Sequence, residues 1–428
     1  MNEIPDQPCR PDTNVKTDFA SPVFSRPRKT IGPAVLTVAI FTRMMRGLLL
    51  VVWLGVHIAQ AQVPDPLWGS SARMDRIRAL LPQLDALYEA HATSNHIPGH
   101  IWGLVVDGRL LHVRAAGMAR VEPEQPVTPA TRFRIASMSK SVTAAAVLQL
   151  RDAGTLSLED PVSKHLPEFQ KVQPATPDSP TLTVRHLLRM SGGFPQDDPW
   201  GDRKLAETDA QLDALVARGL TAASPTGTRW EYSNLGYALL GRIVTRVARE
   251  PYQAYITRRI LKPLGMTNTV YEWDTVPADQ LALGYRWEDE RWKPEPLLHD
   301  GSWGAMGGLI TTLEDFARYS AFHLDAWPPR DGTDTSPLKR STRREMHRPW
   351  EVISVVQDLH DSEGHSVARV AGYSAGLSWN QDQRGLIWVR HAGGLPGFGS
   401  EFRFLPDHGI ALIAFANRTY APMSAVNH

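Results

Sequence analysis

Two clusters of strand-like sequence, one near each end of the chain, limit the possible folds most strongly. The first cluster consists of two apolar runs, 101–106 and 110–113. They are separated by Asp107-Gly108, a dipeptide that favours a two-residue hairpin turn. The second cluster consists of three apolar runs, 386–389, 401–404 and 410–415. Both clusters therefore predict antiparallel strands.

The chain between these clusters is predicted to be mostly helical. Helix-forming residues dominate from Ser137 to about Arg249, with polar connections such as 176–180. A further helix is predicted over 72–93, where apolar residues recur at helical spacing. Strands at both ends around a helical middle predict an α+β fold. We expect one antiparallel sheet formed from both chain ends, flanked by helices, with a mostly helical insertion.

The composition excludes several classes of protein. The chain has 428 residues and a formal net charge of +1, which gives no electrostatic reason to expect a nucleic-acid partner. Cys9 is the only cysteine, so intrachain disulfides and cysteine-rich metal sites are excluded. The sequence contains no H-E-x-x-H, no phosphate-binding G-x-x-x-x-G-K-[ST] and no Rossmann glycine fingerprint.

The amino-terminal region carries the three parts of a secretory signal peptide. Arg43 and Arg46 supply positive charge, and the apolar run 47–58 follows. Ala59-Gln60-Ala61 then matches the small-x-small pattern that signal peptidase reads. This apolar run is shorter than the roughly 20 residues that span a bilayer as a helix. We therefore expect no stable membrane span after cleavage.

These features predict three segments along the chain. A signal peptide normally begins at the initiator methionine, so we expect translation to start at Met44 or Met45. Residues 1–43 would then be a non-native extension, and 44–61 the signal peptide. The remaining residues, 62–428, would form one domain that is periplasmic or secreted.

The segment Gly372-Tyr-Ser-Ala-Gly376 matches G-x-S-x-G, the nucleophile elbow of lipases and esterases. An elbow needs a strand, a turn and then a helix, because the strained turn lifts the serine hydroxyl above the sheet. The sequence after Gly376 contains a turn-like stretch over 380–385 and is otherwise strand-like, with no helix. We therefore predict that Ser374 is not the nucleophile.

Ser137-Met-Ser-Lys140 is the stronger nucleophile candidate. It opens a run of helix formers that ends before Gly154, so Ser137 and Lys140 are predicted to share one helix face. A serine hydroxyl that attacks a carbonyl must lose its proton to an adjacent base. A second S-x-x-K match, 336–339, lies in an Asp/Pro/Gly loop with Pro337 inside the motif, which prevents a helix from organising it.

Two further patterns accompany this serine. Tyr232-Ser-Asn234 is the only Y-x-N in the chain and precedes a predicted helix over 235–250. His391-Ala-Gly-Gly394 follows the apolar strand 386–389, and its glycines would let the backbone approach a ligand closely. His299 begins a second H-x-G match, but His391 is favoured because it ends a strand pattern.

These three motifs, in this order, resemble those of the serine β-lactamase/penicillin-binding-protein superfamily. The resemblance is strongest to the class C β-lactamase-related branch, which includes D,D-peptidases, D-aminopeptidases and family VIII esterases. Supporting segments are 182–192, 307–315 and 393–399, and the resemblance extends from about residue 75 to about residue 420. It implies a serine hydrolase that acts through an acyl-enzyme on an ester, amide or D-amino acid peptide bond.

The resemblance also implies a small-molecule or short-peptide substrate and no metal or organic cofactor. Two alternatives remain open. The chain could be a β-lactamase proper, or a catalytically inactive sensor of the penicillin-binding type.

Residue by residue, the resemblance implies these roles. Ser137 would be acylated, Lys140 would assist its deprotonation, and Tyr232 would carry the proton to the leaving group and later activate water. Asn234 would orient Lys140 or the substrate amide. The backbone N–H groups of Ser137 and Gly394 would form the oxyanion hole. Either Lys140 or Tyr232 could be the base in acylation.

The sequence departs from the class C pattern in two places. The third motif is His391-Ala-Gly393 instead of K-[ST]-G, and a histidine of ordinary pKa near 6.5 is mostly neutral at pH 7. We therefore expect neutral esters or amides to be better substrates than carboxylate-bearing β-lactams, with the difference narrowing towards pH 6. Arg384 or Arg390 could instead anchor a carboxylate. Only 418–428 remain where the family packs a terminal helix, so this helix is expected to be short or truncated.

Overall fold

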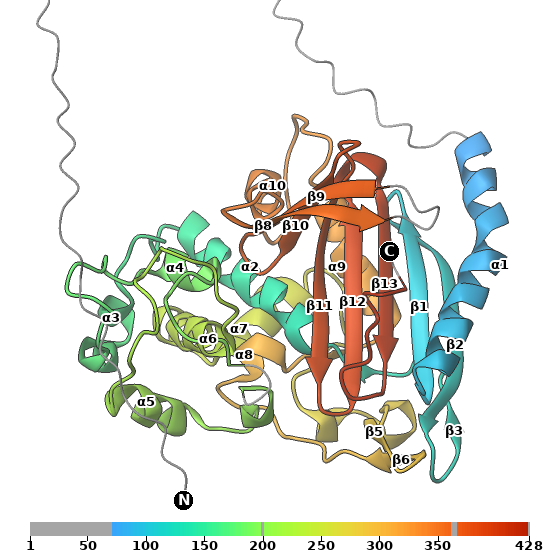
Figure 1. The fold of residues 1–428 in the computed structure, drawn as a ribbon, viewed down its shortest axis with the longest axis horizontal. Coiled ribbons are helices and arrows are strands. Elements are labelled where there is room, and N and C mark those ends of the chain that lie inside the picture. Colours follow the sequence, from blue (N-terminus) through green and yellow to red (C-terminus); the bar gives the residue numbers. More distant parts are fainter. Residues whose placement is uncertain (1–70, 198–200, 361–365, 427–428) are drawn as a thin grey trace, which may run out of the picture. The chain divides into compact units, whose positions relative to one another are not determined.

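The computed structural model describes residues 71–197, 201–360 and 366–426, all within the unit Ala61–His428. The predicted extension 1–43 and signal peptide 44–61 lie outside the described residues. A large antiparallel sheet with helices packed against it confirms the predicted α+β class (Figure 1).

The main sheet contains nine strands among the described residues. They are β1 (Gly99–Val106), β2 (Arg109–Arg120), β3 (Gln125–Pro126), β8 (Glu351–His360), β9 (Ser366–Tyr373), β10 (Ser378–Asp382), β11 (Ile387–Leu395), β12 (Phe398–Leu405) and β13 (Ile410–Ala416). Their order is β3-β2-β1-β13-β12-β11-β10-β9-β8. Two short pairs lie outside it, β4 (Phe133–Arg134) with β7 (Ile310–Thr311) and β5 (Tyr285–Glu288) with β6 (Arg291–Pro294).

The centre of the sheet joins the two ends of the chain, as the sequence predicts. Strand β1 pairs antiparallel with β13, so that Trp102 lies opposite Ala414. The predicted hairpin turn is also present between β1 and β2. Asp107 and Gly108 have φ values of 50° and 76°, as a two-residue type I′ turn requires.

The helices are α1 (Ser71–Ser94), α2 (Ser139–Asp152), α3 (Val162–His165), α4 (Val184–Leu188), α5 (Asp209–Ala217), α6 (Asn234–Ala248), α7 (Tyr252–Ile256), α8 (Gly304–Gly307), α9 (Leu313–Leu324) and α10 (Arg340–Met346). Short 3-10 or π turns are η1 (Ala136–Met138), η2 (Pro167–Lys171), η3 (Gly201–Lys204), η4 (Thr257–Leu261), η5 (Trp273–Thr275), η6 (Ala278–Gln280) and η7 (Pro406–His408). The helix predicted over 72–93 is α1. No helix in the described part of the chain is long and apolar enough to cross a membrane.

Helices cover both faces of the sheet, and this is why β1 is buried along its whole length. Trp102 stacks on Tyr88 of α1 with ring centroids 4.6 Å apart. Ile101, which points to the opposite face, belongs to the main core together with Phe316 of α9. Most other helices form a region beside the sheet, and α2 extends from that region towards β11 (Figure 1).

The structure differs from the sequence-based expectation after α10. Residues 378–382 form β10, where a turn was expected from residue 380, and the chain turns between Asp382 and Leu386. The long hairpin of β8 and β9 was not predicted. Beyond β13, residues 417–426 form turns rather than a helix.

Candidate active site

Ser137 lies in a strand, turn and helix arrangement made by β4, η1 and α2. Ala136 has a φ of 49°, in the left-handed region that costs a residue with a side chain about 1–3 kcal/mol. The Ile135 carbonyl holds the turn, because it accepts from the Met138 N–H at 3.2 Å and from Ser400 Oγ at 2.8 Å. This turn presents Ser137 at the mouth of a cleft, with the residue 7% exposed.

Lys140 lies one turn further along and is fully buried. Its Nζ lies 2.9 Å from Ser137 Oγ, 2.7 Å from Asn234 Oδ1 and 2.9 Å from the Met306 carbonyl oxygen. A neutral amine has two N–H groups and one lone pair. Because the amide and the carbonyl oxygen can only accept, they take the two N–H groups. In the neutral form of Lys140, the lone pair is then directed at the Ser137 hydroxyl.

Asn234 is the first residue of α6 and is fully buried. Its Nδ2 donates to Asp202 Oδ1 at 3.3 Å. A carboxylate only accepts, so Asp202 orients the amide with Oδ1 facing Lys140. Asp197 caps the same helix, because its two carboxylate oxygens accept the N–H groups of Asn234 and Leu235, both at 2.7 Å.

Strand β11 passes directly beside the nucleophile turn. A Cβ on Gly393 would lie 2.3 Å from the Ile135 carbonyl oxygen and 3.0 Å from Ala136 Cβ, so this approach requires glycine. A Cβ on Gly394 would lie 2.5 Å from Cδ1 of Tyr420. The structure therefore brings the motif glycines next to the turn that carries Ser137.

His391 lies in the wall of the cleft and is 5% exposed. Burial, reinforced by the positive charge of Lys140, lowers the pKa of His391 from 6.5 to about 3. Its Nδ1 lies 2.6 Å from the Ala392 carbonyl oxygen and must donate to it. The Nε2 of a neutral ring then accepts from the Tyr373 hydroxyl at 3.3 Å. Neither ring nitrogen is left to donate to a substrate.

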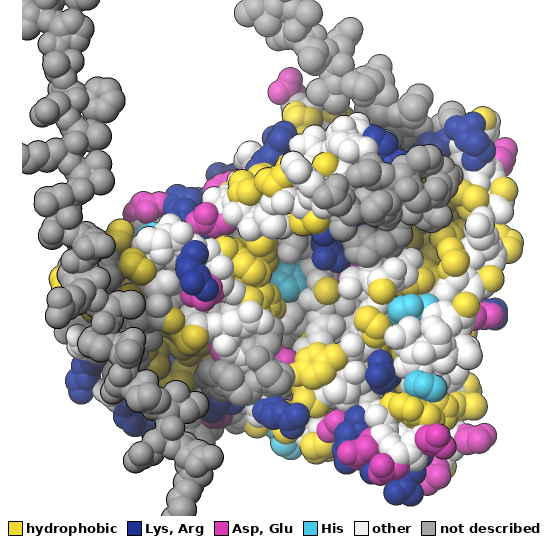
Figure 2. Space-filling view, in the orientation of Figure 1, with side chains coloured by type: hydrophobic (Ala, Val, Ile, Leu, Met, Phe, Trp, Pro, Cys, Tyr) yellow, Lys and Arg dark blue, Asp and Glu magenta, His cyan; other side chains and the backbone are white. Residues whose placement is uncertain are grey.

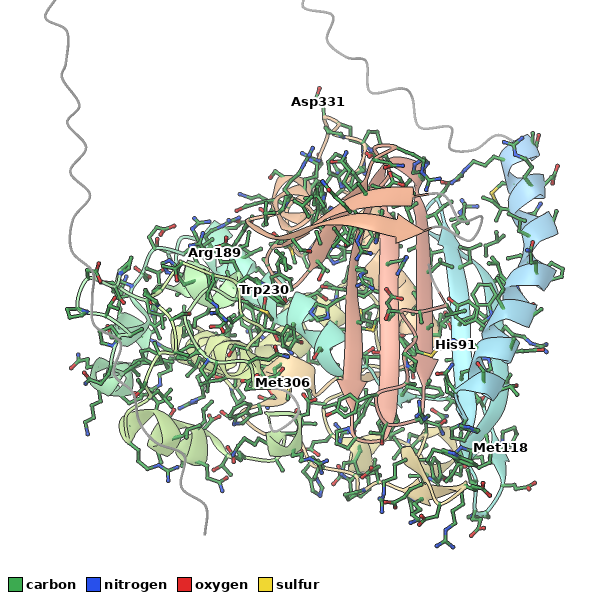
Figure 3. All side chains as sticks on the ribbon, in the orientation of Figure 1. His91, Met118, Arg189, Trp230, Met306 and Asp331 are labelled. Atoms are coloured by element: carbon green, nitrogen blue, oxygen red, sulfur yellow. The ribbon has the colours of Figure 1, made fainter. Side chains whose placement is uncertain are left out.

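The cleft between β11 and the helical region has a volume of about 450 Å³. Five of the predicted site residues line it: Ser137, Tyr232, His391, Gly393 and Gly394. The other two, Lys140 and Asn234, lie buried behind Ser137. The molecular surface is hollowed between the helical region and the sheet (Figure 2), and Trp230 and Met306 lie at that boundary (Figure 3).

Sequence reasoning missed several residues of this site. Trp230, Tyr373, Asp202 and Tyr420 also line the cleft, as does Arg390, which the sequence analysis named only as a possible carboxylate anchor. Trp230 and Tyr373 form an aromatic wall with ring centroids 5.8 Å apart. Tyr373 is the second residue of the G-x-S-x-G match, so that pattern did mark a cleft residue, although not its serine. For the remaining residues the sequence contains no local pattern.

The three motif matches that were set aside lie in other surroundings. Ser374 is fully buried between two strands, and its Oγ donates to the Glu345 carbonyl oxygen at 3.4 Å. Ser336 lies in the loop before α10, and Lys339 is exposed to solvent. His299 is exposed and contacts Glu272 at 3.0 Å. Among the described residues, no group of three or more His, Cys, Asp or Glu side chains is placed to hold a metal ion.

Known proteins resemble this chain in sequence or in fold. Protein flp of Staphylococcus aureus (strain NCTC 8325 / PS 47) is 29% identical over 348 residues, which are 79% of this chain and 64% of that protein. The chain thus spans less than two thirds of the length of this relative.

Three solved structures have a similar fold. The octameric penicillin-binding protein homologue from Pyrococcus abyssi has a TM-score of 0.68 and 25% identity, covering 80% of this chain and 74% of that one. The structure of EstCE1, a hydrolase with promiscuous acyltransferase activity, has a TM-score of 0.65 and 19% identity, covering 82% and 98%. A class C β-lactamase has a TM-score of 0.62 and 22% identity, covering 82% and 96%.

A family model also matches most of the chain. The model described as Beta-lactamase matches residues 84–428, which include every element of the candidate site. The chain therefore belongs to the Beta-lactamase family and has the hydrolase fold of the serine β-lactamase/penicillin-binding-protein superfamily.

Proposed function

We propose that this protein is a serine hydrolase that forms an acyl-enzyme on Ser137 and cleaves ester, amide or D-amino acid peptide bonds. The proposal rests on one contact above all, the 2.9 Å approach of the buried Lys140 Nζ to Ser137 Oγ. The likeness to EstCE1, a hydrolase with acyltransferase activity, is consistent with acyl transfer.

In acylation, the Ser137 hydroxyl passes its proton to the neutral Lys140 amine while its oxygen attacks the carbonyl carbon. The oxyanion that forms accepts hydrogen bonds from the N–H groups of Ser137 and Gly394. Tyr232, whose ring centroid lies 4.9 Å from Lys140 Nζ, gives its phenolic proton to the leaving group. It then regains a proton from Lys140. The leaving group departs protonated, and the acyl group remains on Ser137.

In deacylation, the same residues act on water. Tyr232 and Lys140 remove a proton from the water molecule that attacks the acyl carbon, and the proton returns to Ser137 Oγ as the ester bond breaks. The product is the free acid, and the starting state is restored. Asn234 and the Met306 carbonyl support both steps, because they hold Lys140 Nζ towards Ser137.

We propose that neutral substrates are preferred over those with a carboxylate. His391 occupies the third motif as a neutral ring whose Nδ1 proton is donated to the Ala392 carbonyl. Arg390 lines the cleft, but its Nη1 lies 3.0 Å from the fully buried Glu401 carboxylate. Arg384, the other candidate anchor, is exposed and pairs with Asp382 at 2.9 Å. A β-lactamase activity is the second candidate, because Arg390 would meet a substrate carboxylate if it left Glu401.

The decisive experiment compares a panel of p-nitrophenyl esters, D-amino acid amides, D-Ala-D-Ala peptides and nitrocefin. A fluorophosphonate probe should label wild-type protein at Ser137, with mass spectrometry of the peptide identifying the site, and should not label Ser137→Ala. An inactive sensor would hydrolyse none of the panel. Nitrocefin turnover as efficient as that of the best ester would favour the β-lactamase.

We also propose that the protein is exported and cleaved after Ala61. The support is the order of charge, apolar run and small residues from Arg43 to Ala61. Expression in a Gram-negative host, followed by N-terminal sequencing of the periplasmic protein, tests this. A mature protein that begins near Met1 would exclude it.

A further inference from the structure

A second cavity of about 90 Å³ lies beside the catalytic cleft. Six apolar residues contribute to its lining: Leu205, Pro296, Leu298, Leu395, Pro396 and Phe398. Four charged residues complete it, Arg134, Arg203, Asp202 and Glu295, and their two positive and two negative formal charges cancel. A site of this kind suits an uncharged, apolar group.

A hydrogen bond between Asp202 and Tyr420 lies where this cavity and the cleft adjoin. Asp202 lines both spaces, and its Oδ2 accepts from the Tyr420 hydroxyl at 2.8 Å. Gly394 lines the cleft, whereas the next residue of β11, Leu395, lines the second cavity. Since the Tyr420 ring lies against Gly394, it stands at the point where β11 leaves one space and enters the other.

Tyr420 is held in an unusual backbone conformation. Its φ is 49°, a region that is strained for a residue with a side chain, and such strain is concentrated at functional sites. Its N–H donates to the Phe398 carbonyl oxygen at 3.1 Å, so the backbone is fixed beside β12. The side chain is nevertheless 40% exposed, which leaves space on one side for the ring to move.

The position of Tyr232 indicates which end of the cleft holds the leaving group and which end holds the acyl group. The ring of Tyr232 lies 6.4 Å from that of His391, and Gly394 is three residues further along β11, about 10 Å away at strand spacing. In the proposed mechanism Tyr232 protonates the leaving group, which must therefore lie at the His391 end. The acyl group then extends the other way, past Gly394 towards Tyr420.

We propose that the second cavity receives the distal, apolar end of the acyl group, and that the Asp202–Tyr420 hydrogen bond is a partition that limits acyl length. This inference rests on the proposed function and names a substrate class for it, esters or amides of aliphatic acids. With the partition closed, short acyl groups fit in the cleft. A longer acyl chain enters the second cavity only after the Tyr420 side chain has moved.

The test is the specificity constant for p-nitrophenyl esters from acetate to decanoate. In wild-type protein kcat/KM stops rising once the chain reaches Tyr420. In Tyr420→Ala it continues to rise, by roughly fourfold for each methylene that enters the cavity. The octanoate-to-acetate ratio should therefore increase about tenfold or more over wild type. Tyr420→Phe keeps the ring, loses only the hydroxyl, and should raise the ratio by a smaller factor.

Two controls identify the space that the chain enters. Leu298→Trp, added to Tyr420→Ala, fills the second cavity and should reverse the gain for octanoate. Acetate esters of alcohols of increasing length extend towards the other end of the cleft, and their kcat/KM profile should not respond to Tyr420→Ala. A response in this alcohol series, or no reversal by Leu298→Trp, would overturn the inference.

Failure of this inference differs from failure of the proposed function. If Ser137→Ala hydrolyses the acetate ester as well as wild type does, the proposed function is wrong. If hydrolysis depends on Ser137 but the acyl-length profiles of wild type and Tyr420→Ala coincide, only the partition is wrong. Should Tyr420→Ala not fold, as seen by circular dichroism, an unchanged octanoate-to-acetate ratio in Tyr420→Phe has the same meaning.

Discussion

The turns that carry Ser137 and Ser374 make an instructive pair. Ser374 lies in the G-x-S-x-G sequence of a nucleophile elbow, but it connects strand β9 to strand β10, and its N–H donates to the Leu377 carbonyl at 2.8 Å. Ser137 lacks that sequence, yet its turn leads from strand β4 into helix α2. The geometry of an elbow is therefore found at the serine without the motif. The element after the turn, a helix or a strand, decides which serine can act.

The two serines also differ in the partner that each hydroxyl has. Ser137 Oγ faces an amine that can take its proton, whereas Ser374 Oγ faces a backbone carbonyl that cannot. The segment around Ser374 nevertheless supports the site. A Cβ on Gly376 would lie 2.6 Å from the Lys140 carbonyl oxygen, so this turn packs against the backbone of α2. Ser374 thus belongs to the scaffold of the Ser137 site.

The largest difference between the two turns should appear in activity. Ser137→Ala removes the atom that is acylated and should lower kcat/KM for an activated ester by about 10⁴-fold or more. Ser374→Ala removes one buried, long hydrogen bond and should retain most of the activity. Steady-state kinetics on both purified variants measures this. Loss of activity only in Ser374→Ala would reverse the assignment of the two serines.

A substitution of Asn234 tests whether residues outside α2 help to position Lys140 for catalysis. Asn234→Ala removes an oxygen that lies 2.7 Å from Lys140 Nζ. Lys140 becomes positively charged when it takes the proton of Ser137, and hydrogen bonds to charged groups contribute about 1.5–3 kcal/mol, so kcat should fall roughly 10- to 100-fold. If Lys140 is positioned by α2 alone, kcat will stay within about twofold of wild type. Asn234→Gln, which keeps the amide on a longer side chain, should recover only part of the loss.

Gly376 tests the contact between the two turns. Gly376→Ala and Gly385→Ala both place a side chain at positive φ, 72° and 86°, which costs about 1–2 kcal/mol in each variant. Only Gly376 meets the backbone of Lys140, because a Cβ on Gly385 would have no atom within 4 Å. We expect Gly376→Ala to melt several degrees below Gly385→Ala and to lose activity that the control retains. Equal melting temperatures and equal activities would show that this contact contributes neither to stability nor to activity.

Much of the fold and part of the site could be predicted because the signals are local. Two apolar runs and Asp107-Gly108 define the hairpin within a few residues of sequence. Ser137 and Lys140 are one helical turn apart, so the spacing of the motif already implies that they meet. The close approach of β11 was likewise visible in its paired glycines.

The remaining parts of the site depend on contacts between distant segments. Asp202 reaches Asn234 from 32 residues away, Met306 reaches Lys140 from 166, and Tyr420 reaches Asp202 from 218. No local periodicity records such contacts, because they exist only after the helical region and the sheet have packed together.

The pKa of His391 could also not be predicted from the sequence, and it changes the prediction for substrate preference towards pH 6. That expectation assumed an ordinary histidine, whereas burial beside Lys140 lowers the pKa of this ring to about 3. Its burial involves Tyr373, the residue before Ser374. The G-x-S-x-G segment therefore influences the cleft through its tyrosine.

The smallest expected effect on activity follows from this pKa. The ring of His391 stays neutral from pH 8 to pH 6, so the ester-to-nitrocefin ratio should not change over that range. Stability should respond instead. Since the pKa is about 3 in the folded state and near 6.5 in the unfolded chain, the unfolded chain binds the proton first as the pH falls. The stability due to the neutral ring is thus complete above pH 6.5 and is lost progressively towards pH 3, by about 2 kcal/mol at pH 5.

Urea unfolding of wild type and His391→Gln at pH 7 and pH 5 measures this term directly. The acid-induced loss of unfolding free energy should be smaller in the variant, because the variant has no proton to gain at position 391. His323 provides a comparison within the same protein, since burial also lowers its pKa to about 3. It lies in α9 and is fully buried, so His323→Gln should reduce the acid sensitivity similarly. A ratio of ester to nitrocefin turnover that shifts with a midpoint between pH 6 and pH 7 and disappears in His391→Gln would instead mean that this ring titrates near 6.5 in the cleft.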